Sequence, residues 1–324
     1  MTDFRIGIDL GGSKIEGAAI DTQGKLRVRR RVSTPAGDYH GTIAAIVAMV
    51  GSIDREIGGP GSVGVAMPGA ISPATGLVKN ANSTCLNGRP FHADLAAALG
   101  RPVHVANDAN CFALSEAADG AAAACRTVFG VILGTGVGGG IAIDGQILRG
   151  ANAIAGEWGH NPLPWPTAEE RPGPDCYCGR SGCVETFLSG PAMAADHCRH
   201  FEEDSSPAEI ASAAERGEER SRATMTRYID RLARGLAMVI NLIDPEAIVL
   251  GGGLSQISSL YRDVPRIWGR YIFSDRVDTP LLAPAHGDAS GVRGAAWLWP
   301  PGVRPDETVP RLQRNLRAER RDRE

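Results

Sequence analysis

The chain contains two copies of a strand–glycine–strand unit, and this repeat is the feature that most constrains its fold. The first copy covers Gly7 to Asp21 and the second covers Gly130 to Asp144, and seven of the fifteen aligned positions are identical. In each copy a short apolar run ends at glycines, and a second run leads to a turn, which is typical of a β-hairpin. We therefore expect an internally duplicated protein with a glycine-tipped hairpin in each half.

The second copy also matches a dinucleotide-binding fingerprint, but its context argues against that function. Gly134, Gly136 and Gly139 satisfy the pattern G-x-G-x-x-G, which requires a helix directly after the glycines. Here the sequence IAIDG and a turn follow instead, and the chain has no G-x-x-x-x-G-K-[ST] motif. Glycines in tight turns still expose backbone N–H groups that can cradle a phosphate. The two hairpins therefore predict a phosphate site of a different kind.

One acid and three glycine clusters make up this predicted phosphate site. Asp9 directly precedes the first cluster, and a carboxylate there suits Mg²⁺, which prefers carboxylate and phosphate oxygens. The equivalent residue of the second copy is Ile132, so the two halves differ chemically. The alternative is that the glycines only shape turns. The residues that we assign to ATP or phosphate binding are Asp9, Gly11, Gly12, Ser13, Lys14, Gly134, Thr135, Gly136, Gly252 and Gly253.

A metal-binding pattern lies in the segment 157–185. His160, Cys176, Cys178 and Cys183 provide one imidazole and three thiols, which is a complete tetrahedral ligand set for Zn²⁺. Four protein ligands leave no open coordination position, so we expect a structural role. The alternative is three buried or incidental thiols.

Composition and charge indicate a cytoplasmic protein of two domains. The chain has 324 residues, which is more than one hydrophobic core usually serves, so two domains are expected. With 43% hydrophobic and 22% charged residues, its composition is that of an ordinary globular protein. A formal net charge of -3 gives no electrostatic argument for binding nucleic acid. The beginning, MTDFRIGIDL, lacks the positive charge of a secretory signal, and no stretch approaches the ~18 apolar residues of a membrane span. Seven cysteines, an odd number, favour a reducing compartment over a disulfide framework.

Periodicity predicts the main helices. Helical patterns cover 38–56, 109–124 and 222–243, and the last carries apolar residues at core-facing spacing. A final helix, in GVRGAAWLWP, is expected to stop at Pro300. The segment 303–324 is charged and rich in arginine, and we expect a disordered or frayed tail.

Five motifs in order resemble the ROK (repressor–open-reading-frame–kinase) family of sugar kinases. They are DLGGSK, ANDAN, LGTGVGGG, GEWGH with CYCGRSGCVE, and IVLGGG. The resemblance implies an actin/hexokinase-like α/β fold, with two duplicated ribonuclease-H-like domains, ATP and sugar in the cleft between them, and a zinc-bound loop. The implied domains are 1–116 with about 290–302, and 117–289. A homodimer is also implied.

The resemblance assigns roles to single residues. It makes Asp108 the general base, and it implies that His160 holds zinc through one ring nitrogen and faces the sugar with the other. The alternative for Asp108 is an Asx turn or a cap of the following helix. The implied sugar-binding residues are Gly69, Asn82, Asn107, Glu157, His160 and Glu185.

Within the family, ANSTCLNG, GHNPLPW and GVRGAAWLW look most like bacterial fructokinases. We therefore expect phosphorylation of D-fructose at its 6-hydroxyl by ATP and Mg²⁺, with structural Zn²⁺. An N-acetyl group would need apolar room that Trp158 or Trp165 would deny. The alternatives are an N-acetylglucosamine kinase, or a glucokinase or mannokinase of the same family. More distant are a sugar-responsive regulator, which would need a helix-turn-helix before the first motif, and a zinc hydrolase, which would need an open metal position.

Overall fold

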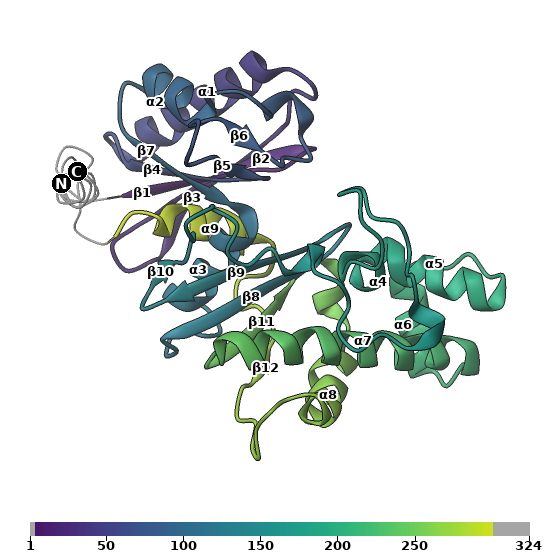
Figure 1. Cartoon of the computed structure of the whole chain (residues 1–324). Helices are drawn as coiled ribbons and strands as arrows, with labels where there is room; N and C mark the ends of the chain where they lie inside the picture. The colour runs from purple at the N-terminus through teal and green to yellow at the C-terminus, as the bar shows by residue number, and fades with distance from the viewer. Residues whose placement is uncertain (1–3, 301–324) are drawn as a thin grey trace, which may run out of the picture. The chain divides into compact units, whose positions relative to one another are not determined.

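The computed structural model describes residues 4–300, so the tail predicted at 303–324 lies outside the described residues. The described chain forms two compact units, residues 4–108 with 295–300 and residues 109–294, and Figure 1 shows their elements. The sequence predicts domain boundaries after residue 116 and near 290. Helix α9 (Ser290–Trp297) contributes residues to both units. No helix in the described range has the length and apolar character that crossing a bilayer requires.

The first unit is built on a five-stranded sheet in the order β3-β2-β1-β4-β7. Strand β1 pairs antiparallel with β2 and parallel with β4, and β4 pairs parallel with β7. A separate pair, β5 and β6, forms a small hairpin. The strands are β1 (Arg5–Leu10), β2 (Lys14–Ile20), β3 (Leu26–Ser33), β4 (Ser62–Met67), β5 (Ala70–Ile71), β6 (Val78–Lys79) and β7 (Val103–Asn107).

Helices α1 (Tyr39–Ile57) and α2 (Phe91–Leu99) cover one face of this sheet. A Cβ at Gly17 of β2 would overlap the sulfur of Met49 in α1, so glycine allows the close approach. On the opposite face, the indole of Trp299 donates a hydrogen bond to the carbonyl of Val63 at 2.7 Å. The sheet is therefore covered on both faces, which suits its buried, apolar strands.

The second unit repeats this sheet. Its order is β10-β9-β8-β11-β12, and β8 pairs antiparallel with β9 and parallel with β11. The outer pairs β9–β10 and β11–β12 are antiparallel and parallel, respectively, as are β2–β3 and β4–β7 in the first sheet. The strands are β8 (Thr127–Leu133), β9 (Val137–Ile143), β10 (Gln146–Ile147), β11 (Ala247–Gly251) and β12 (Leu281–Leu282).

The two hairpins differ by one residue. Leu10 pairs with Ile15 in the first hairpin, whereas the equivalent Leu133 pairs with Val137 in the second, so the second connection is shorter. The ungapped sequence alignment is therefore correct along β1 and β8. It is shifted by one position along β2 and β9.

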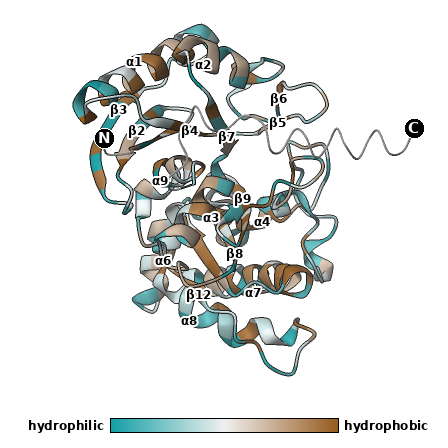
Figure 2. Ribbon diagram, turned by 90° about the vertical axis from the view of Figure 1, so that its left-hand side faces the viewer, coloured by the Kyte–Doolittle hydropathy of each residue, from teal (hydrophilic) through white to brown (hydrophobic). Residues whose placement is uncertain are grey.

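Helices cover both faces of the second sheet as well. Ala113 of α3 lies against Gly130 on one face, and α7 contributes Leu232, Leu236 and Ile240 to the core on the other. In Figure 2, brown segments alternate with paler or teal ones along α1 and α7, as expected for helices with one buried face. The helices are α3 (Asp108–Ala118), α4 (Glu185–Leu188), α5 (Gly190–Phe201), α6 (Pro207–Glu215), α7 (Glu219–Ile243) and α8 (Ser258–Ile267).

The predicted helix 109–124 is wrong at its end, because α3 stops at Ala118. The buried carboxylate of Glu116 accepts a hydrogen bond from the N–H of Ala121 at 2.9 Å, and its backbone carbonyl accepts from Ala122 at 2.9 Å. The alanine-rich segment therefore turns around Glu116. A side chain thus overrides the helix propensity of the alanines.

Candidate functional site

The carboxyl ends of three parallel strands bring predicted site residues to one edge of the first sheet. Asp9 lies near the end of β1, Gly69 follows β4, and Asn107 ends β7. The Asn107 side chain donates a hydrogen bond to the carbonyl of Gly69 at 3.2 Å. Helix α3 begins at Asp108, directly after β7. Asp108 therefore lies at the same edge of the sheet as Asn107. Ligands of open α/β sheets bind at such edges.

Asp9 and Asp108 interact electrostatically at this edge. Burial, and then the negative charges of Asp108 and Glu16, raise the pKa of Asp9 from its usual 3.8 to about 6, while Lys14 opposes them. A carboxylate whose charge is disfavoured in this way is stabilised by a cation. Asp9 is therefore suited to holding Mg²⁺, as its place before the glycines predicts.

The first glycine loop is held by its own backbone and by Thr34. The N–H of Gly11 donates to the carbonyl of Lys14 at 3.0 Å, which closes the hairpin. The Thr34 hydroxyl donates to the carbonyl of Gly11 at 2.8 Å. Within the described residues, the amides of Gly12 and Ser13 make no such bond. Gly11 therefore shapes the turn, and the next two amides are the ones available to an anion.

In the second hairpin too, the first glycine amide is bonded within the turn and the next two amides are not. The N–H of Gly134 donates to the carbonyl of Gly136 at 3.0 Å, so Gly134 also shapes its turn. Among the described residues, no hydrogen bond from the amides of Thr135 and Gly136 is found. Gly252 has a φ of 78°, and a Cβ there would overlap the carbonyl of Leu133 at the end of β8. The second and third glycine clusters therefore lie side by side at the carboxyl edge of the second sheet.

Glu185, predicted as a sugar ligand, lies at the second glycine loop. Its carboxylate accepts a hydrogen bond from the N–H of Val137 at 2.8 Å. A Cβ at Gly136 would come within 2.6 Å of the same carboxylate oxygen. Glu185 therefore joins the zinc-binding segment to the loop that is predicted to bind phosphate.

The four predicted zinc ligands come together. The ligand atoms of His160, Cys176, Cys178 and Cys183 all lie within 4.8 Å of one another. The Nδ1 atom of His160 is 3.5 Å from the sulfur of Cys176, and the sulfurs of Cys178 and Cys183 are 3.6 Å apart. Zinc bonds of about 2.3 Å to sulfur and about 2.0 Å to nitrogen require tetrahedral edges of roughly 3.5–3.8 Å. The donor set and its spacing therefore fit Zn²⁺.

Buried charges attach the segment between His160 and Cys176 to helix α7. Glu170 accepts hydrogen bonds from Arg231 at 2.7 Å and from Arg234 at 2.8 Å. Although burial opposes it, these hydrogen bonds lower the pKa of Glu170 to about 2. Arg234 also donates to the carbonyl of Trp165 at 2.9 Å. Breaking one member of such a buried set leaves an unpaired charge, so the segment is held firmly.

Tyr177, which the sequence analysis does not single out, contacts the other nitrogen of His160. Its hydroxyl lies 2.9 Å from Nε2, and the two rings meet edge to face at 5.1 Å. Packing around the hydroxyl, and then the negative charges of Glu185 and its neighbours, raise the pKa of Tyr177 to about 12. Glu157 is among these neighbours, so the tyrosine lies amid the predicted sugar ligands of this unit. The only sequence signal for it is its place between two cysteine ligands.

The two tryptophans that were expected to exclude an N-acetyl group are occupied elsewhere. Trp158 is 3% exposed and donates its indole hydrogen to the carbonyl of Gly138 at 3.0 Å. Trp165 stacks on Tyr271 with ring centroids 5.4 Å apart. Trp158 is therefore too buried to block an N-acetyl group, whereas Trp165 is 52% exposed.

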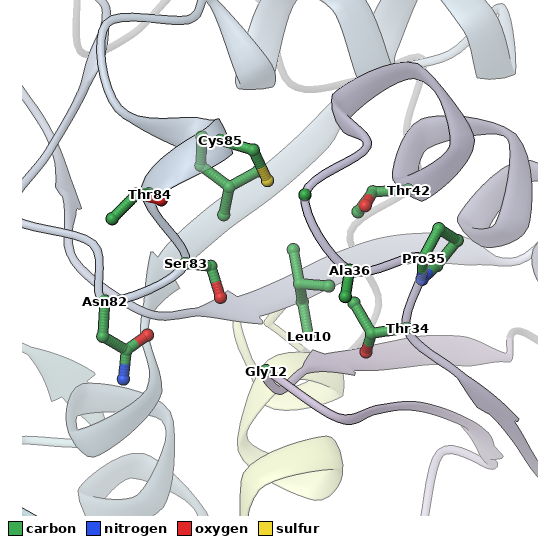
Figure 3. Close-up of a pocket in the computed structure, with 12 residues that line it drawn as sticks. Leu10, Gly12, Thr34, Pro35, Ala36, Thr42, Asn82, Ser83, Thr84 and Cys85 are labelled. Carbon is green, nitrogen blue, oxygen red and sulfur yellow. The ribbon is translucent and has the colours of Figure 1, made fainter.

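Asn82, the remaining predicted sugar ligand, lines a pocket of the first unit. Figure 3 shows this pocket between the segment 34–37 and the segment 82–86, with Leu10 between them. The pocket therefore opens beside the strand that carries Asp9.

Comparison with known proteins places the chain among sugar kinases over nearly its whole length. The model of the ROK family matches residues 5–301. The N-acetyl-D-glucosamine kinase of Photobacterium profundum is 37% identical over 296 residues, which cover 90% of this chain and 98% of that protein. The ROK hexokinase of Thermus thermophilus has a TM-score of 0.81 at 29% identity and covers 91% of this chain and 97% of its own. The ROK family glucokinase of Streptomyces griseus, in complex with glucose and AMPPNP, has a TM-score of 0.72 at 27% identity, with 90% and 98% covered.

We predict that Asp9→Asn stabilises the ligand-free protein at about pH 7.5 by about 3 kcal/mol, because the folded state raises the pKa of Asp9. The stability that a protonated Asp9 confers is lost as the pH rises from 3.8 to about 6. The gain should therefore shrink as the pH falls toward about 4. Urea unfolding at several pH values measures it, with the exposed Asp275→Asn as the matched control. Equal stability of Asp9→Asn and wild type at neutral pH would contradict the assignment.

We predict that the purified protein contains about one Zn²⁺ per chain. Cys178→Ser should lose most of this zinc and lower the melting temperature, since it removes one of four ligands. Cys198→Ser, at an exposed cysteine outside the cluster, should retain both. Elemental analysis together with thermal melts decides the matter, and full zinc content in Cys178→Ser would rule out the proposed ligand set.

Proposed function

Because the chain belongs to the ROK family, we propose that it is an ATP-dependent sugar kinase that prefers N-acetyl-D-glucosamine. One observation carries the choice of sugar: the similarity to N-acetyl-D-glucosamine kinases, at 37% identity over 98% of the Photobacterium profundum protein. This was the alternative to fructose in the sequence analysis. A glucokinase or mannokinase remains the second candidate, since the Streptomyces griseus glucokinase is similar over 90% of this chain.

The fructokinase prediction is not supported by these comparisons. It rested on three short motifs, and two of them, GHNPLPW and GVRGAAWLW, contain residues that pack in the structure. Leu163 belongs to the core of the second unit, and Trp299 donates to a backbone carbonyl of β4. Similarity at these residues therefore indicates similar packing and does not indicate which sugar is bound.

In the proposed reaction, Asp108 accepts the proton of the attacking hydroxyl while the sugar oxygen bonds to the γ-phosphorus and ADP leaves. The hydrogen bond from Asn107 to Gly69 fixes the end of β7, and Asp108 follows directly, so this bond helps to position Asp108. Glu157 and His160 are proposed to bind sugar hydroxyls, and Asn82 is proposed to bind another part of the sugar. For His160 this means that a sugar hydroxyl replaces the hydroxyl of Tyr177 at Nε2.

The phosphates are assigned to backbone amides rather than to cationic side chains. Gly12, Ser13, Thr135 and Gly136 carry the amides that the two hairpins leave available, and Lys14 adds positive charge. Gly252 and Gly253 are proposed to complete the ATP site. Mg²⁺ held by Asp9 would neutralise charge on the transferred phosphate.

Zinc is assigned a structural role in this proposal. It would fix the segment that carries Glu157, His160 and Glu185, and it leaves the chemistry to these side chains. The actin/hexokinase-like duplicated domains with a cleft, the homodimer and the cytoplasmic location also remain proposals.

We predict that the wild-type protein releases ADP from ATP in the presence of Mg²⁺ and N-acetyl-D-glucosamine. Asp108→Asn should lower kcat by at least ~100-fold with sugar binding retained, because only the proton acceptor is lost. Steady-state kinetics and calorimetric titration of the sugar check the two parts, and Asp275→Asn is the control for the same chemical change on an exposed residue. Near-normal turnover in a folded Asp108→Asn protein would overturn the assignment of the base.

A further inference from the structure

The pocket of the first unit has a volume of about 310 Å³ and two walls. One wall is the segment 34–37 together with Thr42, and the other is the segment 82–86. Leu10 and Gly12 lie between the walls, and Figure 3 shows Leu10, Ser83 and Cys85 next to this space. A Cβ at Gly12 would lie 3.9 Å from the hydroxyl of Ser83, so the glycine loop and the second wall nearly meet.

The lining of this pocket is uncharged. Its apolar part comes from Leu10, Pro35, Ala36, Cys85 and Leu86. Its polar part includes the segment 82–84, an amide followed by two hydroxyls, whose side chains have no hydrogen-bond partner among the described residues. This combination differs from the carboxylates and imidazole that are proposed to bind sugar hydroxyls. It matches a group that is neutral, partly apolar and able to donate and accept hydrogen bonds.

The second wall is tied to the catalytic edge of the sheet. Asn87 accepts from the N–H of Ala81 at 2.9 Å and donates to its carbonyl at 2.8 Å. A Cβ at Gly69 would come within 2.7 Å of the nitrogen of Ala81, and the side chain of Asn107 donates to Gly69. A continuous set of contacts therefore runs from Asn107, next to Asp108, to the residue that precedes Asn82.

We propose that this pocket binds the N-acyl group of the substrate and has room for acyl groups longer than acetyl. The inference rests on the proposed function, because it places one part of an N-acylated amino sugar. An acetamido group offers one carbonyl acceptor, one N–H donor and a methyl group. The polar segment 82–84 suits the amide, and Ala36, Leu10 and Leu86 suit the methyl end.

Size supports the second half of the inference. If each of its four heavy atoms takes about the 30 Å³ that a water molecule takes in the liquid, an acetamido group needs roughly 120 Å³, which is less than the pocket volume of about 310 Å³. Ala36 and Gly37 have small or no side chains, so they take up little of the pocket. A Cβ added at Gly37 would meet no atom within 4 Å. Space beyond the methyl group therefore remains for one or two further methylene groups.

The test uses a series of acyl groups and two variants that narrow the pocket. We expect wild-type protein to phosphorylate N-propionylglucosamine with a kcat/KM within about 3-fold of that for N-acetylglucosamine, since a roomy apolar pocket discriminates weakly between such homologues.

Ala36→Leu and Ser83→Val narrow the pocket from opposite walls. Each should lower kcat/KM for N-acetylglucosamine by about 10-fold or more, and more for the longer acyl groups. The kcat/KM for glucose and the KM for ATP should stay within about 2-fold. Ala98→Leu, on the exposed face of α2, is the matched control.

The outcomes separate the inference from the function on which it rests. Loss of activity on N-acetylglucosamine and glucose in equal measure, or a raised KM for ATP with unchanged sugar preference, would overturn the acyl pocket alone. So would a drop beyond about 30-fold from N-acetyl to N-propionyl in wild type. If wild-type protein phosphorylates no N-acylated sugar at all, the proposed function fails, and the inference fails with it. If one variant does not fold, the other still decides between these results.

Discussion

Parallel pairing of β1, β4 and β7 is the constraint on which the candidate site depends. It places the ends of these strands at one edge, so that Asp9, Gly69 and Asn107 become neighbours although they lie far apart in sequence. The hydrogen bond from Asn107 to Gly69 and the charge interaction between Asp9 and Asp108 both follow from this pairing. Two carboxylates held together in a partly buried site disfavour their own ionisation. A bound cation or a transferred proton relieves that repulsion, which is the chemistry that phosphoryl transfer to an alcohol requires.

Much of the fold could be predicted because each copy of the repeat has the sequence pattern of a β-hairpin. A glycine-tipped hairpin in each half implies two sheets, and the observed sheets share one strand order and one set of directions. What the alignment missed is a single residue in the second hairpin connection, since Val137 rather than Gly138 pairs with Leu133. Ungapped identity between short glycine-rich segments contains no information on loop length. The end of α3 was missed for another reason: the Glu116 carboxylate accepts a hydrogen bond from the N–H of Ala121, which the alanine-rich pattern assigns to a helix.

The candidate site was predictable where residue types define the chemistry. One histidine and three cysteines specify a tetrahedral site by their ligand atoms, and the four side chains do gather. The choice of sugar was less predictable, because it depends on where a few side chains point. Trp158 and Trp165 were expected to fill the space for an N-acetyl group, but one is buried against β9 and the other stacks on Tyr271. The small residues that line the proposed acyl pocket, Ala36 and Gly37, belong to none of the recognised motifs.

The proposed acceptor can be tested most directly in one competition reaction. Wild-type protein would receive limiting ATP with Mg²⁺ and equal concentrations of N-acetylglucosamine, glucose, mannose and fructose, and mass spectrometry would measure the phosphate esters. Product ratios in such a mixture report the ratios of kcat/KM, and the N-acetylhexosamine ester is separated from the hexose esters by its mass. We predict that the N-acetylhexosamine phosphate exceeds the total of the hexose phosphates. A mixture dominated by hexose phosphates, or ADP formed without any sugar ester, would contradict it.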